Sequence, residues 1–73
     1  LQPAIQAYEQ ALALKPDYAH ARFNLAEAFE LINPKRAVQE YETFLILAEG
    51  NPQEFSKAQL AKRKIESLEK GHR

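Results

Sequence analysis

One stretch of this sequence recurs 33 residues further along, and this internal repeat limits what the chain can fold into. Residues 4–14 read AIQAYEQALAL and residues 37–47 read AVQEYETFLIL. Small and aromatic residues hold matching places in the two stretches: Ala4, Tyr8 and Ala11 in the first, and Ala37, Tyr41 and Phe44 in the second. Repeats of this period are typical of arrays in which each unit buries its apolar face only against its neighbours.

The composition favours helices over strands. The chain has 73 residues with 45% hydrophobic residues, two glycines and four prolines. Its apolar residues recur three and four positions apart, which is the spacing of one face of a helix. The sequence therefore predicts an all-α fold of antiparallel helices over residues 3–14, 18–32, 34–49 and 52–70. Each helix alone is marginal in water, because short helices need a packed neighbour over their apolar side.

Capping and breaking residues set these predicted boundaries. The residues predicted to cap helix N-termini are Asp17, Asn33 and Asn51. The prolines predicted to occupy first helical positions are Pro34 and Pro52, and Gly50 is predicted to follow a helix end. In the fourth helix, Phe55, Ala58, Ala61, Ile65 and Leu68 are predicted to form the buried stripe. On its exposed side, Lys62 and Glu66 are spaced for an i,i+4 ion pair.

Charge and cysteine content exclude several classes of function. Ten basic and ten acidic residues cancel, so no overall field attracts nucleic acid or a membrane surface. The absence of cysteine excludes disulfides, thiolate metal sites and a cysteine nucleophile. No stretch has the length of a spanning helix and no leader opens the chain. Without such segments the chain is expected to be soluble, with the cytoplasm favoured and the periplasm as the alternative compartment. Because it starts at Leu1 rather than Met, we expect it to be a fragment.

The repeated residues resemble the tetratricopeptide repeat, a helical hairpin of about 34 residues. The second half of one such repeat is matched by Ala4, Tyr8, Ala11 and Pro16, and the first half of the next by Leu25, Ala26 and Phe29. Three departures stand out. Arg22 takes the place of a large aromatic residue, Phe44 replaces a small one, and one residue is missing from the turn at Asn33.

The resemblance implies a solenoid and a division of the chain. Residues 1–16 would be the second helix of a truncated repeat, 17–51 a complete hairpin, 52–70 a capping helix and 71–73 a tail. In this family the first helices of successive repeats line a concave groove that holds a peptide. The resemblance therefore implies that this chain is a non-enzymatic scaffold for a protein or peptide partner. By position, the groove residues are His20, Phe23, Asn24, Glu27, Glu30 and Leu31. Phe44 would meet the capping helix.

The first helix is expected to lack the partner that the repeat pattern supplies. Its apolar face consists of Ala4, Ile5, Tyr8 and Leu12. The sequence therefore predicts that the fragment self-associates as a homo-oligomer through this face, or that preceding helices of the parent protein cover it.

The residues predicted to line the groove give little support for carboxylate binding, metal binding or catalysis. Asn24 occupies the position where some family members clamp a carboxylate, but the cations that share that task are missing. His20 has no second ligand at metal-binding spacing, and His72 lies in the tail. The pair Glu27 and Glu30 is typical of a solvated helix face rather than of an acid and base. No catalytic residue, metal ligand or cofactor is therefore predicted.

A second hypothesis for function concerns the fourth helix. Residues 51–73 carry a net charge of +3, against −3 for residues 1–50. The helical cations are Lys57, Lys62, Arg63, Lys64 and Lys70. They offer a contact for nucleic acid or an anionic surface, although interleaved glutamates and the lack of stacking aromatics favour a solvated capping face.

Overall fold

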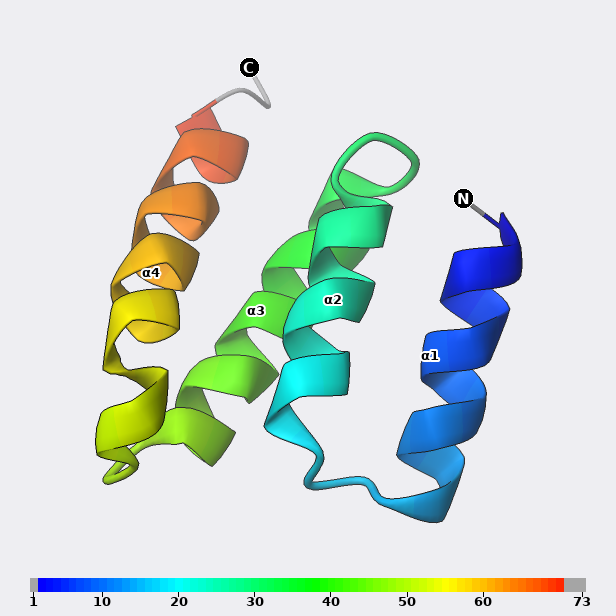
Figure 1. The fold of residues 1–73 in the computed structure, drawn as a ribbon. Helices are drawn as coiled ribbons and strands as arrows, with labels where there is room; N and C mark the ends of the chain where they lie inside the picture. Colours follow the sequence, from blue (N-terminus) through cyan, green and yellow to red (C-terminus); the bar gives the residue numbers. More distant parts are fainter. Residues whose placement is uncertain (1, 71–73) are drawn as a thin grey trace.

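The structure, a computed structural model, describes residues 2–70 and consists there of helices without strands. Four α-helices follow one another: α1 (Gln2–Leu14), α2 (Ala19–Phe29), α3 (Pro34–Ala48) and α4 (Phe55–Lys70), with a 3-10 turn, η1 (Pro52–Glu54), before α4. They run alternately up and down in a row, with α1 and α4 on the outside (Figure 1). The all-α class predicted from the sequence is confirmed.

The N-terminal caps follow the predictions at two of three positions. Asn33 Oδ1 accepts a hydrogen bond from the Arg36 backbone N–H at 3.2 Å, and Asn51 Oδ1 accepts one from the Gln53 N–H at 3.1 Å. The prediction for Asp17 is wrong. Because α2 begins one residue later than expected, Tyr18 occupies the cap position and supplies no side-chain hydrogen bond.

Two helix boundaries differ from the prediction by three residues, each because of a tight turn. The second helix ends at Phe29 rather than at residue 32, since the chain reverses through residues 30–32 to reach Asn33. The Phe29 carbonyl accepts from the N–H groups of both Ile32 and Asn33, at 3.1 and 2.8 Å. The fourth begins at Phe55, after the 3-10 turn. Gly50 has the expected left-handed backbone, with φ of +78°, a conformation that side chains disfavour.

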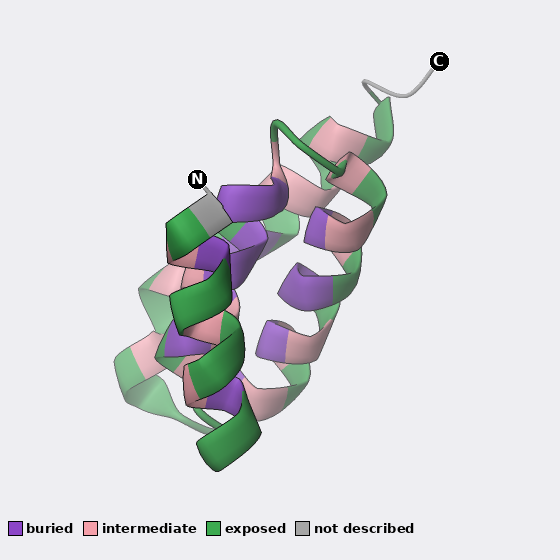
Figure 2. Ribbon diagram, turned by 90° about the vertical axis from the view of Figure 1, so that its right-hand side faces the viewer, coloured by how far each residue is buried: buried purple, intermediate pink, exposed green. Residues whose placement is uncertain are grey.

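The core runs through all four helices. Its buried apolar residues are Ile5, Leu12, Ala21, Phe23, Leu25, Ala26, Ala28, Phe29, Ala37, Tyr41, Phe44, Ala48 and Ala61. In Figure 2 the buried residues lie on the sides of the helices that face one another. Ala26, Ala37 and Ala61 have no exposed surface, which is consistent with small side chains allowing close approach of helix backbones.

The aromatic residues of the core join α2 to α3. The Phe23 ring lies edge-on to Tyr41, with centroids 5.4 Å apart, and to Phe44, at 5.1 Å. Tyr41 and Phe44 are fully buried. The bulky Phe44 thus has its aromatic partner on α2, within the hairpin.

One prediction about the apolar residues of α4 is wrong. Phe55 is 63% exposed, because the residues that face inward from α4 are Ala58, Ala61, Ile65 and Leu68. Leu31, predicted to line the groove, is 87% exposed and lies in the turn after α2 rather than on the helix. The expected Lys62–Glu66 pair is also replaced, because Glu66 accepts from Lys70 at 3.2 Å.

Candidate functional site

The predicted groove residues of α2 fall into three different environments. His20 and Glu27 are exposed, and Asn24 and Glu30 are half-buried. Phe23 is only 3% exposed, so the prediction that it contacts a partner is wrong. Its ring is enclosed by Tyr41 and Phe44, and the Lys57 ammonium lies 5.6 Å from the ring centroid.

Two polar side-chain contacts connect α4, which packs along α3, to α2. Lys57 Nζ lies 2.8 Å from His20 Nδ1, near the start of both helices. Two turns further along α4, Lys64 Nζ donates to Glu30 Oε2 at 2.9 Å, near the end of α2. The two lysines are seven residues apart and therefore lie on one side of α4. These contacts leave a surface shared by α2 and α4, on which His20 and Glu27 are accessible.

The predicted self-association face is covered within the chain. Ile5 is 5% exposed and Leu12 is 8% exposed, and Tyr8 packs against the same core. Ala4 is half-buried. The expectation that this face lacks a partner is wrong, because α2 packs along α1 and supplies the cover. The outward side of α1 contains Ala7 and, at its end, Leu14, which is 90% exposed.

Comparison with known proteins supports the resemblance to the tetratricopeptide repeat. Residues 1–32, which contain α1 and α2, match the model of the TPR repeat. The chain is also similar to the uncharacterized protein ycf37 of Cyanophora paradoxa, with 43% identity over 67 residues. That similarity covers 90% of this chain but 35% of the relative, so the chain spans about a third of that protein's length. No solved structure matches the chain.

Arg22, one of the departures from the tetratricopeptide pattern, belongs to a network of charges. Its Nη1 donates to Glu40 Oε1 at 2.9 Å, and its Nη2 donates to the Pro16 carbonyl at 3.1 Å. Glu40 Oε2 accepts from Arg36 Nε at 2.8 Å, and Arg36 also lies 3.9 Å from Glu9. An ion network linking α1, α2 and α3 therefore occupies a site where the repeat usually has an aromatic side chain.

Glu40 is the centre of this network and is nearly inaccessible to solvent. It is 5% exposed, whereas its two arginine partners retain contact with water. A buried carboxylate is tolerated when its oxygens are all hydrogen-bonded to cations, and here each oxygen has one arginine. The Arg22 Nε atom is buried without a partner. The network supports the fold, and we find nothing in it that points to chemistry.

Tyr41 links the hairpin to α4 through Glu30. Its hydroxyl donates to Glu30 Oε2, the same oxygen that accepts from Lys64. Burial raises the pKa of the Tyr41 phenol far above its ordinary value of 10.0, and the hydrogen bond and negative charge of Glu30 raise it further. The hydroxyl is therefore a permanent donor at physiological pH.

The raised pKa of Tyr41 predicts a loss of stability in alkaline solution. The unfolded chain releases the phenol proton near pH 10 while the folded chain retains it, so the stabilisation is complete below about pH 10 and is lost above it. Tyr41→Phe should weaken the decline in unfolding free energy between about pH 9 and pH 11. Urea denaturation across this range measures the slope. Tyr18→Phe is the matched control, because Tyr18 is 42% exposed, and an equal effect of both substitutions would contradict the assignment.

The basic residues of α4 do not form one free cationic surface. Lys57 contacts His20, Lys64 is paired with Glu30, and Lys70 is paired with Glu66. Lys62 and Arg63 are exposed, and neither forms an ion pair within residues 2–70. The cations of α4 are therefore used largely to attach this helix and to stabilise its end. His72 and the rest of the predicted tail lie outside the described residues.

No metal site is found in the described part of the chain, where no group of three or more His, Cys, Asp or Glu side chains converges. Asn24 and His20 are the candidates for polar recognition that remain accessible on α2. The sequence did not indicate Lys57 and Lys64 as their neighbours on this surface. The spacing of seven residues between Lys57 and Lys64 predicts that they share one side of their helix, but it does not show that this side faces α2.

None of the helices in residues 2–70 has the combination of length and apolarity that crossing a membrane requires.

Proposed function

We propose that this chain is a non-enzymatic scaffold that binds a polypeptide partner on the surface shared by α2 and α4. The match to the tetratricopeptide repeat supports a role in protein–protein interaction. The observation that carries the proposal is the pair of contacts Lys57–His20 and Lys64–Glu30, which links α4 to α2 at two heights. In this proposal residues 17–51 form the complete hairpin, residues 52–70 cap it, and residues 1–16 complete the preceding repeat.

Preorganisation explains how such a surface gains affinity. The side chains of Asn24 and Glu27 project from a helix whose other side is buried in the core, at Leu25, Ala26 and Ala28. Little backbone entropy is lost when a partner binds a surface that is already ordered, so the cost falls mainly on the partner segment. Polar groups on this surface can pair with the backbone or side chains of an extended segment.

The proposal predicts that Asn24→Ala combined with Glu27→Ala abolishes peptide binding without unfolding the chain. The probe is a phage-displayed library of random dodecapeptides, from which enriched sequences are synthesised and measured by calorimetry. We expect at least a tenfold loss of affinity in the double variant, because it removes two polar anchors from the centre of the surface. Circular dichroism should show unchanged helicity.

A matched control lies on α3. Gln39 and Glu42 are also an amide and a carboxylate three positions apart, and both are exposed. Gln39→Ala combined with Glu42→Ala should leave peptide affinity unchanged. The proposal fails if the library yields no specific peptide, or if the α3 pair rather than the α2 pair controls binding.

A further inference from the structure

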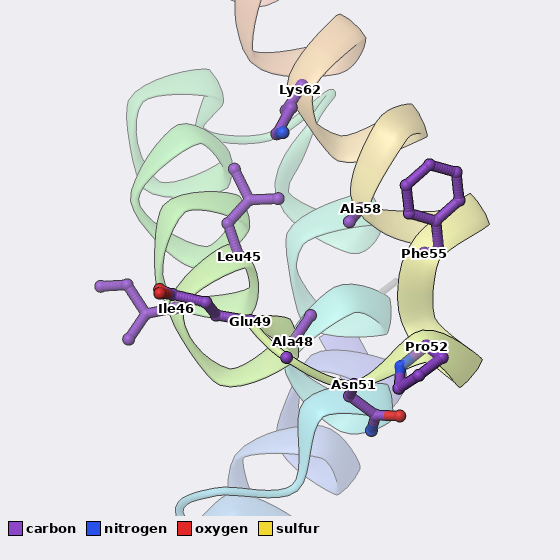
Figure 3. Close-up of a pocket in the computed structure, with 10 residues that line it drawn as sticks. Leu45, Ile46, Ala48, Glu49, Asn51, Pro52, Phe55, Ala58 and Lys62 are labelled. Carbon is purple, nitrogen blue, oxygen red and sulfur yellow. The ribbon is translucent and has the colours of Figure 1, made fainter.

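A groove separates the last turns of α3 from the first turns of α4, away from the surface proposed to bind a partner. It has a volume of about 680 Å³ and is lined by ten residues between positions 45 and 62, none of which belongs to α2. Most of the lining is apolar (Figure 3). Ile46 on α3 is 71% exposed and Phe55 on α4 is 63% exposed. Two large apolar side chains left in solvent beside one groove indicate an interaction surface.

Opposite charges lie at different heights along this groove. In Figure 3, Lys62 is at its upper end on α4, with the side chain turned across the groove toward Leu45, and Glu49 is lower, beside the connection between the helices. The residue expected to pair with Lys62 is Glu66, which is taken by Lys70. Within residues 2–70 neither Lys62 nor Glu49 forms an ion pair, and both are exposed.

We propose that the occupant of this groove is a second copy of the chain, related to the first by a two-fold axis. An isologous contact places each patch against its own copy in the opposite direction. Lys62 of one chain then faces the partner subunit's Glu49, and the reciprocal pair forms at the other end. Ile46 and Phe55 meet apolar side chains across the axis and leave solvent. One surface that has apolar side chains and one charge of each sign at different heights is complementary to a second copy of itself.

The size of the groove predicts a weak, reversible dimer. A standard interface covers about 800 Å² on each partner with 20 to 30 residues a side. This groove has ten lining residues, so the contact belongs to the small class of interfaces. We therefore expect dissociation constants in the range of about 10 µM to 1 mM rather than a permanent dimer.

Charge reversal tests the pairing directly. Sedimentation equilibrium of the 73-residue chain from about 10 µM to 1 mM should show a monomer–dimer equilibrium. Glu49→Lys alone, or Lys62→Glu alone, creates two like-charge contacts by symmetry and should weaken dimerisation about tenfold or more. The double variant restores both attractive pairs and should return the dissociation constant to within about threefold of the parent. A chain that stays monomeric near 1 mM, or a double variant as weak as the single ones, would overturn the proposal.

A second pair of variants tests the apolar part of the contact. Ile46→Ser should weaken the dimer, whereas Leu14→Ser, at an apolar residue on α1 that is even more exposed, should leave it unchanged. Both are surface changes that preserve the fold, which circular dichroism verifies. If Leu14→Ser dissociates the dimer and Ile46→Ser does not, the contact lies on α1 and the proposal is wrong. These measurements need no peptide, so their result is independent of the proposed partner surface.

Discussion

Glu40→Ala is expected to reduce the free energy of unfolding by about 3–5 kcal/mol. The carboxylate is 5% exposed and accepts from Arg22 at 2.9 Å and from Arg36 at 2.8 Å. Removing it leaves the Arg22 guanidinium next to the core without a counter-charge, and its Nε already lacks a hydrogen-bond partner. Breaking one side of a buried ion pair is costly for this reason, whereas the pair itself contributes little net stability.

Such a loss would remove a large part of the stability of a chain of this size. At about 0.05–0.15 kcal/mol per residue, a domain of this length has roughly 4–11 kcal/mol in total, so the loss is between about a quarter and all of it. We expect the variant to show a much lower urea midpoint. The measurement is urea denaturation at 25 °C, followed by circular dichroism.

Two further variants separate the network from other effects of the substitution. Glu42→Ala changes an exposed carboxylate on the same helix and should shift stability by less than about 0.5 kcal/mol. Arg22→Leu combined with Glu40→Leu should recover much of the loss, because no buried charge then remains and Arg36, 41% exposed, can return to water. A cost below about 1 kcal/mol for Glu40→Ala would show that solvent reaches the site in the folded chain.

The sequence predicted the helices well because the signals that define them are local. Asn33-Pro34 and Asn51-Pro52 each combine a capping side chain with a residue fitted to a first turn, and the structure has both caps. The role of Gly50 after the end of α3 was also predictable from the sequence, since few other residues accept a left-handed backbone conformation. The cap predicted at Asp17 was wrong because a shift of one residue in the start of α2 changes which side chain occupies the cap position.

The ion network could be suspected but not predicted. Arg22 departs from the family pattern, and that departure is visible in the sequence. Its partner Glu40 is 18 residues away on another helix, and nothing local shows how the two helices are rotated about their axes. The same rotation decides that Lys57 and Lys64 face α2. Contacts of this kind depend on tertiary packing, which local propensity does not encode.

Packing also explains why the interaction surfaces differ from those expected. The sequence placed Phe23 in the groove and Phe55 in the core, and the structure reverses these roles. Phe23 is buried because Tyr41, Phe44 and Lys57 surround it, the last from a helix whose position the sequence did not fix. Likewise Ile5 and Leu12 are covered by the next helix of their own chain, whereas Ile46 and Phe55 remain exposed beside the groove between α3 and α4.

The second large effect that we expect is a difference in unfolding free energy between substitutions of Phe23, which is buried, and of Phe55, which is exposed. Phe23→Ala should cost about 3–5 kcal/mol, because it removes a ring from a closely packed aromatic cluster and leaves a cavity. Phe55→Ala, at a residue that is 63% exposed, should change the unfolding free energy by less than about 0.5 kcal/mol. In thermal unfolding, Phe23→Ala should lower Tm by more than about 10 °C.

Both variants should be compared at a protein concentration of about 5 µM, below the expected range of dimerisation, so that Phe55→Ala reports on the monomer alone. Under these conditions the two side chains differ in burial but not in chemistry. If Phe55→Ala costs as much as Phe23→Ala, then α4 turns its Phe55 side inward, and the groove beside α3 closes. The contacts Lys57–His20 and Lys64–Glu30 would be lost with the same rotation, because they depend on the side of α4 that faces α2. One thermal comparison therefore tests the helix orientation on which both proposed surfaces depend.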